Sequence, residues 1–505
     1  MKFAQQAKAF RRFSRGFLVE KLPEAPQDRK VLVLVLPWME TAVPWFAMAM
    51  AMFYRSQGRR VTLLLDDLPA PNPAEKPDQI PLIAKAAEEL RGPLEVTLLS
   101  ALNESDGPRE GVKGMDGLCV LNQAYLDRTG VSDQTGRDAF RKGLEDRAPR
   151  LRTLLAARKW EHVLLPGGIY STSGLTRVLG EHSGIRTACY DSGVGALTLA
   201  TDSIAGHCMD LAKIFAPEHE SYVRRYWADA LRLGREEFNL RKAARDLWSY
   251  QVSAYRSWDG EPFDIVLPMN VFDDSAALGR NRYFKDAREW ILETVDFVMN
   301  QTQASIVVRE HPGARRLARP DHFGKILQER FGGQSRFRFV GCREEVNTYA
   351  LIEGAKLVLP HSSTVGVEAA LMGKQVLLDT GVYYAGLGFV ERGDSKEDYF
   401  LKLKRLLEEG RALEEEKRER AWVCYFYGQV CNFVIGQFTP QPEDFRVWVS
   451  RKWREVMESP DAQTSLAVLG DASPSWRIQS EEVFKNGRVT PSPEKKGWWE
   501  RLWGQ

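Results

Sequence analysis

The chain has 505 residues, more than one hydrophobic core organises, so we expect two domains. Hydrophobic residues make up 44% and charged residues 27%, the balance of a soluble or peripheral globular protein. The 70 basic and 68 acidic residues leave a net charge of +2, which argues against bulk nucleic-acid binding. No apolar run reaches the roughly eighteen residues of a membrane-spanning helix, so we expect none.

The first segment, residues 1–22, spaces apolar side chains at helical intervals and places basic residues between them. The apolar positions are Phe3, Ala7, Phe10, Phe13 and Phe17. The segment lacks the apolar region and the cleavage site of a secretory signal. Two alternatives remain: a helix on an anionic membrane surface, or a helix whose phenylalanines pack on the protein itself. We favour the packed helix, because one short helix binds membranes weakly.

Residues 28–250 are expected to form a first Rossmann-like domain. The segments 30–36 (KVLVLVL) and 60–65 (RVTLLL) are near-continuous apolar strands with a helical segment between them. This order is typical of a doubly wound parallel sheet. Further strands are expected at 94–99 and 117–121, and a polar helix at 138–158.

A second strand–turn–helix–strand unit spans residues 162–193 and ends in an acidic turn, YDSG. Asp191 lies at the end of its last strand, where open α/β sheets hold their ligands. If the chemistry is glycosyl transfer, a base must deprotonate the acceptor hydroxyl, and Asp191 is our first candidate with Asp202 in reserve. An Asx turn or a helix cap before Gly193 is the alternative interpretation of Asp191.

The α/β alternation starts again after a junction near 250–262, and residues 262–420 are expected to form a second Rossmann-like domain. Closing helices are expected over 421–457. The stretch 458–505 is rich in Ser, Pro, Gly and charge, which predicts a disordered tail. Its tryptophans beside lysines are compatible with contact at a membrane interface.

Two segments of the second domain predict an anion site. In the stretch 355–389, a short apolar strand runs into His361, Ser362, Ser363 and Thr364, just before a helix. Hydroxyls and free N–H groups at a helix start favour negative charge, although an ordinary capped turn has the same pattern. In the segment REHP, His311 ends a strand of the same sheet. A strand-end histidine is often only structural, but here it would join the turn in holding a phosphate without metal.

No metal or zinc site is assigned. The six cysteines show no CxxC or other metal-ligand spacing, which indicates a reducing compartment. The acidic pairs Asp66-Asp67 and Asp273-Asp274 are possible metal ligands by composition, but the first has the place of a loop after a strand.

The combination resembles the bacterial glycosyltransferases of the two-Rossmann-domain (GT-B) type that use CMP-activated sugars. These are the capsule-polysaccharide Kdo transferases and, more distantly, the bacterial sialyltransferases. The resemblance lies mainly in residues 264–389, in the segments PMNVFDDSA, REHP, PHSSTVGVEAALMGK and DTGVYYAGLGF, with YDSG in the first domain. Leu387 stands where the family usually has tryptophan, and the capsule enzymes have glutamate at the position of Asp191.

The resemblance implies a role for each matching residue. Asp191 would be the catalytic base. The nucleotide would be held by the REHP segment, by the hydroxyl turn with the glutamate that follows it, and by the first loop of the second domain. These nucleotide-binding residues are Arg309, His311, Ser362, Ser363, Thr364, Glu368 and Asn270, with Ser275 beside Asn270.

We therefore expect an α/β protein with two Rossmann-like domains facing a cleft, C-terminal helices and a disordered tail. Its expected activity is cytoplasmic, metal-independent transfer of a sugar from a nucleotide donor, CMP-linked and Kdo-like, to a capsule or lipid-linked acceptor. The nucleotide sugar is a co-substrate, and we expect no other cofactor and no nucleic-acid partner. Peripheral contact with the inner membrane surface is compatible with the aromatic-basic ends. The alternatives are a nucleotide-sugar 2-epimerase or CDP-polyol phosphotransferase of the same fold, and a non-catalytic glycan-binding or scaffold relative.

Overall fold

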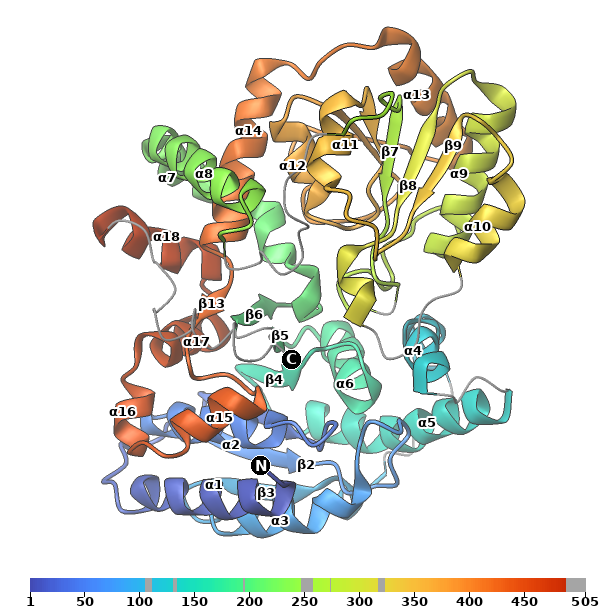
Figure 1. Ribbon diagram of the computed structural model, residues 1–505. Helices are drawn as coiled ribbons and strands as arrows, with labels where there is room; N and C mark the ends of the chain where they lie inside the picture. Colours follow the sequence, from blue (N-terminus) through green and yellow to red (C-terminus); the bar gives the residue numbers. More distant parts are fainter. Residues whose placement is uncertain are drawn as a thin grey trace. The chain divides into compact units, whose positions relative to one another are not determined.

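The structure is a computed structural model that describes residues 1–104, 111–129, 134–193, 196–246, 258–272, 274–316 and 323–486. The chain forms two compact units. Unit 1 contains residues 1–210 and a returning segment, Asn432–Gln479. Unit 2 contains Leu211–Cys431 and the chain from Ser480 onward. Each unit is built on its own mainly parallel α/β sheet, which confirms the predicted fold class (Figure 1).

The sheet of unit 1 has the order β13-β6-β5-β4-β1-β2-β3. Strands β1 to β5 are parallel, whereas β6 and β13 pair antiparallel at one edge. The strands are β1 (Lys30–Val35), β2 (Arg60–Leu65), β3 (Glu95–Leu98), β4 (His162–Pro166), β5 (Thr187–Gly193), β6 (Ala196–Thr201) and β13 (Val434–Ile435). Chain order reverses between β1 and β4, which are hydrogen-bonded neighbours, so this is the switch point of the sheet.

Side chains of β1 alternate between two cores, because successive residues of a strand point to opposite faces. Val31, Val33 and Val35 pack with helices α1, α2, α3 and α15 to α17, whereas Leu32 and Leu34 pack with α4 to α6. The helices are α1 (Phe3–Leu18), α2 (Val43–Ser56), α3 (Ile80–Glu88), α4 (Met115–Thr129), α5 (Gln134–Ala156), α6 (Ser171–His182), α15 (Pro442–Trp448), α16 (Trp453–Met457) and α17 (Pro460–Asp471).

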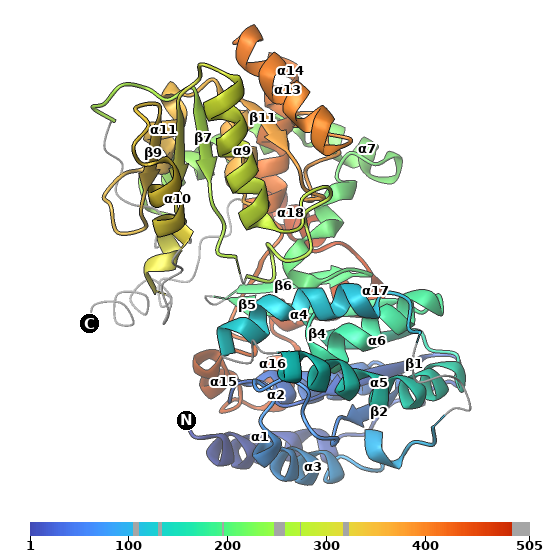
Figure 2. The ribbon, with the colours of Figure 1, turned by 90° about the vertical axis from the view of Figure 1, so that its right-hand side faces the viewer.

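Helix α1 packs on the protein itself, as we favoured. Its phenylalanines are buried, with Phe10 stacked 5.4 Å from Trp45 and Phe13 edge-on to Trp448 at 5.3 Å. Arg11 pairs with Glu89 just beyond α3, and both ribbon views show α1 and α3 side by side (Figure 2). Burying one such side chain stabilises the fold by roughly 1.5–3 kcal/mol. The apolar face of this helix is therefore used within unit 1.

The sheet of unit 2 has the order β12-β11-β10-β7-β8-β9, and all its pairs are parallel. Its strands are β7 (Ile265–Pro268), β8 (Ile306–Arg309), β9 (Phe337–Val340), β10 (Leu357–Val358), β11 (Gln375–Leu378) and β12 (Glu391–Arg392). Chain order reverses between β7 and β10. The switch point of unit 2 therefore lies at the ends of these two strands.

Helices cover both faces of this second sheet. Those packed in the large apolar cluster with β7 and β8 include α9, α10 and α13. The helices are α7 (Pro217–Arg225), α8 (Trp227–Lys242), α9 (Ala287–Gln301), α10 (Phe323–Phe331), α11 (Thr348–Gly354), α12 (Val365–Leu371), α13 (Lys396–Glu409) and α14 (Glu415–Tyr425). Helix α18 (Ser475–Asn486) starts in unit 1 and ends in unit 2. None of the helices in the described ranges combines the length and apolar composition needed to cross a bilayer.

Three expectations differ from the structure. The units divide at Asp210, before α7 and α8, because α8 packs on α14 of unit 2; the expected first domain 28–250 therefore ends too late. The expected strand 117–121 lies within helix α4. Residues 460–486 of the expected disordered tail form α17 and α18, which bury Leu469 and Trp476 in the protein. The rest of that tail, 487–505, lies outside the described residues.

Candidate functional site

A hydrogen bond ties the two strand ends at the switch point of unit 2. Asn270 follows β7, and its side-chain oxygen accepts a hydrogen bond of 3.2 Å from the backbone N–H of Ser362, which follows β10. Ligands of open α/β sheets bind in this place, outside the carboxyl ends of the strands where the order reverses. Asn270 and the hydroxyl turn, both predicted from the sequence, are therefore brought together by the fold.

The hydroxyls of this turn differ in their surroundings. Thr364 is the N-cap residue of α12, but its side chain makes no capping hydrogen bond. Ser363 Oγ accepts a hydrogen bond of 3.3 Å from Val365 N–H, and the Ser362 hydroxyl lies 3.4 Å from His361 Nδ1. All three hydroxyl residues are half-buried. The turn thus places three hydroxyls at the switch point, and not all of them form hydrogen bonds with the start of the helix.

His311 lies one strand further along, at the carboxyl end of β8. Its Nδ1 accepts a hydrogen bond of 3.0 Å from Gly313 N–H. Burial, with the charges of Arg241 and Arg309, lowers the pKa of His311 to about 4. The neutral ring therefore carries its proton on Nε2, which is a hydrogen-bond donor. Strands β8 and β10 flank β7, so His311 and the turn are about two strand spacings, roughly 10 Å, apart.

Arg309, the last residue of β8, and Glu368 of α12 are buried and have roles inside the protein. Arg309 is 1% exposed, and its guanidinium donates to backbone carbonyls of the segment 340–346, including Val346 at 3.1 Å. The structure therefore assigns Arg309 to holding that segment. A strand-end arginine in sequence does not reveal that backbone carbonyls surround it.

Glu368 belongs to a buried charged cluster. Its carboxylate is 1% exposed and lies 3.7 Å from the Arg241 guanidinium, which also donates to Tyr349 Oη at 3.1 Å and pairs with Asp246 at 3.3 Å. Burial raises the pKa of Glu368, and the nearby Arg241 opposes that rise. The cluster connects α8, α11 and α12, so Glu368 supports the turn from behind.

Sequence reasoning missed a buried polar chain beneath the turn. His361 is 1% exposed and its Nε2 lies 2.9 Å from Asn281 Oδ1, while Asn281 Nδ2 donates to Asp379 Oδ2 at 3.0 Å. Burial lowers the pKa of His361 to about 3 and raises that of Asp379 to about 6. Thr380 Oγ1 also donates to the His361 carbonyl. The segments PHSST and LLDTG carry His361, Asp379 and Thr380, and Asn281 lies in the earlier segment GRNRY. Only their contacts in the folded chain mark these residues as one group.

At the switch point of unit 1 the strand ends carry aromatic rings and strained backbone. Trp38 follows β1 and Tyr170 follows β4, and their rings stack at 5.2 Å between centroids. Met39 (φ 44°), Glu40 (φ 59°) and Ser171 (φ 44°) adopt the left-handed conformation that non-glycine residues rarely occupy. Each such residue costs about 1–3 kcal/mol, and such strain collects at functional sites.

Asp191 lies on the same edge of this sheet, near the carboxyl end of β5. The expected acidic turn is instead a strand, in which Asp191 pairs with Thr198 of β6. Asp191 Oδ1 accepts a hydrogen bond of 2.7 Å from Ser192 N–H, and the Ser192 carbonyl accepts from Gln441 at 3.0 Å. The carboxylate is half-buried. Asp191 thus lies near the carboxyl end of a strand, where open α/β sheets hold their ligands.

Asp202, the reserve base, lies at the opposite end of the strands, beside the amino end of β5. It follows β6, which runs antiparallel to β5, and its carboxylate accepts a hydrogen bond of 2.7 Å from Thr187 N–H at the start of β5. Asp191 and Thr187 are four residues apart on one strand, roughly 13 Å. Asp202 therefore cannot share a site with Asp191, and we assign it to closing the β5–β6 pair.

Two buried carboxylates follow β2 on the same edge. Asp66 forms a buried ion pair with Arg147 at 2.9 Å and accepts from Thr172 Oγ1 at 2.6 Å, so it has a structural role. Glu75 is 4% exposed, and its Oε1 has no hydrogen-bond partner in the described chain. Burial, with the charge of Asp66, raises the pKa of Glu75 to about 8. Glu75 is protonated at neutral pH and was not singled out by its sequence position.

Metal ligation and thiol pairing complete the description of the site chemistry. In the described ranges, His, Cys, Asp and Glu side chains form no group of three or more that could hold a metal ion. All six cysteines are free thiols. Asp273, which the sequence paired with Asp274, lies outside the described residues.

Comparisons with known proteins give matches among solved structures only. No family model matches the chain, and no curated protein does. A KpsC β-Kdo 2,7-transferase from Thermosulfurimonas dismutans is similar at 18% identity over 55% of this chain and 79% of that one, with a TM-score of 0.32. MurG from Acinetobacter baumannii is similar at 9% identity over 84% and 99% of the two chains, with a TM-score of 0.26.

A UDP-GlcNAc 2-epimerase from Neisseria meningitidis, bound to UDP-GlcNAc, is similar at 12% identity over 78% and 95% of the two chains, with a TM-score of 0.24. The KpsC match names the same kind of enzyme that the sequence segments resemble. What the chain itself establishes is a pair of doubly wound α/β units with polar residues at the switch points of their sheets.

Proposed function

We propose that the protein is a glycosyltransferase that moves a sugar from a nucleotide donor, CMP-linked and Kdo-like, to a surface-glycan or lipid-linked acceptor. The observation that carries the proposal is the Asn270–Ser362 hydrogen bond at the switch point of unit 2, with the half-buried hydroxyls of residues 362–364 after β10 and His311 after β8. The similarity of these segments to capsule Kdo transferases supports the choice of donor.

In this mechanism unit 2 holds the nucleotide. The Nε2–H group of neutral His311 donates to a phosphate or ribose oxygen, and the hydroxyls from Ser362 to Thr364 donate to the phosphate. Because His311 stays neutral above about pH 4, its hydrogen bond does not depend on pH near neutrality. Such donors stabilise the charge that develops on the phosphate as the glycosidic bond breaks.

Unit 1 supplies the acceptor side. The Asp191 carboxylate removes the proton from the acceptor hydroxyl as its oxygen bonds to the sugar, and the nucleotide leaves as its phosphate. The stacked rings of Trp38 and Tyr170 at the same sheet edge offer an apolar surface for a sugar ring. Each group acts from the carboxyl end of a strand in its own sheet.

Nucleotide binding is tested first by thermal melting of the full chain with CMP, CDP, UDP, GDP and ADP. A ligand at about a hundred times its Kd adds roughly 2.7 kcal/mol of stability. A shift with CMP alone that is lost in His311→Ala supports the proposal. The matched control is His182→Ala, because His182 is an exposed histidine at the end of α6 and its loss should leave the shift intact.

A shift with UDP or GDP instead of CMP contradicts the proposed donor. The absence of any shift favours a non-catalytic protein. Transfer is then tested with Asp191→Asn, which should abolish sugar transfer while the nucleotide shift remains. Asp202→Asn is its control, because Asp202 lies at the other edge of the sheet and should retain transfer. Turnover of the nucleotide sugar without an acceptor indicates an epimerase.

A further inference from the structure

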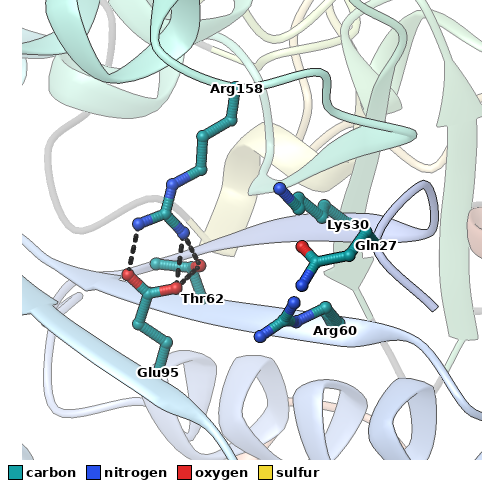
Figure 3. Close-up of a pocket in the computed structure, with 6 residues that line it drawn as sticks. All are labelled: Gln27, Lys30, Arg60, Thr62, Glu95 and Arg158. Atoms are coloured by element: carbon teal, nitrogen blue, oxygen red, sulfur yellow. Dashed lines mark hydrogen bonds and ion pairs between the residues drawn. The ribbon is translucent and has the colours of Figure 1, made fainter. Parts of the chain in front are cut away.

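A polar cavity of about 330 Å³ lies at the amino ends of the strands of unit 1. Its lining residues come from the starts of the first three strands and from the segments beside them. They are Gln27, Lys30, Arg60, Thr62, Glu95 and Arg158 (Figure 3). The carboxyl ends of the parallel strands, where Asp191 lies, form the opposite edge of this sheet. The cavity is thus separate from the candidate site.

The strand register places four of these side chains on one face of the sheet. Lys30 pairs with Arg60, and Thr62 pairs with Glu95. Arg60 and Thr62 are two residues apart on β2, so they point the same way. Strands of a parallel sheet are normally apolar on both faces. Three of the four, Lys30, Arg60 and Glu95, are the polar first residues of their strands. Lys30 is half-buried and Arg60 and Glu95 are exposed, whereas Thr62 is buried.

Among the described residues, two of the cations in the cavity form no direct ion pair, although Arg60 adds to the effect of Arg158 in lowering the pKa of Glu95. Arg158 and Glu95 form a bidentate pair with hydrogen bonds of 2.5 and 2.6 Å. In the described part of the chain, neither the Lys30 ammonium nor the Arg60 guanidinium has a hydrogen-bond or ion-pair partner. They lie on neighbouring strands in direct register, where like charges destabilise a sheet.

The charge of Arg60 also acts on a cation outside the cavity. Burial, with the charge of Arg60, lowers the pKa of nearby Arg55. Arg29, another cation at this edge, is 3.5 Å from Glu161 and so is already paired. The excess positive charge is therefore concentrated on Lys30 and Arg60, and an anion bound between them would relieve their repulsion.

The other groups of the cavity suit hydroxyls rather than further charge. Figure 3 shows Gln27, Lys30 and Arg60 entering from one side, with their polar ends toward the Arg158–Glu95 pair. The Gln27 amide offers a donor and an acceptor, and the Glu95 carboxylate is an acceptor. A cavity of about 330 Å³ is at the small end of ligand sites, the size of a single sugar rather than a nucleotide sugar.

We propose that this cavity is a binding site for an acidic sugar, a monosaccharide unit that carries a phosphate or a carboxylate. Lys30 and Arg60 bind the anionic group, and Gln27 and Glu95 bind hydroxyls. The site is independent of the nucleotide site of unit 2. It holds an acidic sugar unit at a distance from the strand ends where transfer is proposed.

The test measures binding to the full chain by calorimetric titration with glucose 6-phosphate and glucuronate. Glucose serves as the neutral probe, and inorganic phosphate serves as the anion without a sugar. We expect both acidic sugars to bind more tightly than glucose and than phosphate. The tighter of the two shows whether phosphate or carboxylate is the preferred anion.

The double variant Lys30→Met/Arg60→Gln should weaken binding of the acidic sugars by about tenfold or more, because two charge-assisted hydrogen bonds are lost. The matched control is Arg29→Gln, which removes a neighbouring cation outside the cavity and should bind like wild type. Three results would overturn the proposal: the acidic sugars do not bind, they bind the double variant as tightly as wild type, or inorganic phosphate binds as tightly as they do. The nucleotide-induced melting shift should be the same in the double variant, in Arg29→Gln and in wild type. A loss of sugar binding with this shift intact is therefore distinct from a failure of the proposed transferase function.

Discussion

Gly366 offers a sharp test of the packing beneath the hydroxyl turn. It is the second residue of α12, and a Cβ there would lie 2.2 Å from Tyr384 Oη and 2.9 Å from Pro360 Cγ. Tyr384 is fully buried, and its hydroxyl donates to the Ser363 carbonyl at 2.7 Å. Gly366→Ala must therefore move the ring that holds the backbone of the turn.

The expected cost follows from three contributions. Overpacking a well-filled site costs about 1–3 kcal/mol. Breaking the hydrogen bond between Tyr384 and Ser363 costs roughly 1 kcal/mol. Alanine regains about 1 kcal/mol over glycine inside a helix. The net loss is about 2 kcal/mol, which should lower the melting temperature of unit 2 by roughly 4–8 °C in scanning calorimetry. The nucleotide-induced shift should weaken as well.

Gly117→Ala is the matched control, because Gly117 lies in helix α4. Among the described residues, no atom beyond the local helix backbone lies within 4 Å of the position that a Cβ would take there. The same chemical change at this position should stabilise unit 1 by about 0.5–1 kcal/mol. Opposite signs at the two glycines support the packing described here. A Gly366→Ala protein that melts as high as wild type, or higher, refutes it.

Three further predictions concern buried groups. His361 is neutral in the fold, so its stabilising contribution is full above pH 6.5 and is lost as the pH falls toward about 3. The difference in unfolding free energy between wild type and His361→Gln, measured by denaturant unfolding, should therefore shrink by about 2 kcal/mol from pH 7 to pH 5. Trp476→Ala should destabilise unit 1 by about 3–5 kcal/mol in calorimetry, because Trp476 is fully buried. An unchanged melting temperature would instead support the disordered tail that the sequence predicted. Arg241→Met leaves Glu368 and Asp246 without their cation and should cost unit 2 about 3–5 kcal/mol, whereas a loss near zero would show that the cluster is not an ion network.

The fold was predictable where the sequence of a single segment identifies it as a buried strand. The runs that became β1 and β2 are apolar at nearly every position, which only a strand buried on both faces requires. The apolar run 117–121 has the same local character, yet it lies in α4, because a short apolar run does not distinguish a strand from one face of a helix.

The site was predictable only in part, for reasons of tertiary contact. The neighbourhood of Asn270 and Ser362 follows from chain order and the switch-point rule. Asp202 is close to Asp191 in sequence, but the antiparallel turn back into β6 carries it to the other edge of the sheet. The burial of Arg309 depends on carbonyls from residues 340–346, which no local pattern indicates. Composition also misled at 460–486, where a few well-placed apolar residues outweigh many polar ones.

The discontinuity of unit 1 has a consequence for how the protein is made. Helix α2 is buried on all sides, and part of its cover, such as Phe438 stacked 4.6 Å from Phe46, comes from the returning segment Asn432–Gln479. The ribosome must first synthesise Leu211–Cys431, which takes roughly 10–45 s at typical elongation rates. During that interval the nascent first unit exposes an apolar helix that lacks its final cover. We expect the emerging chain to need chaperone protection until its last helices arrive.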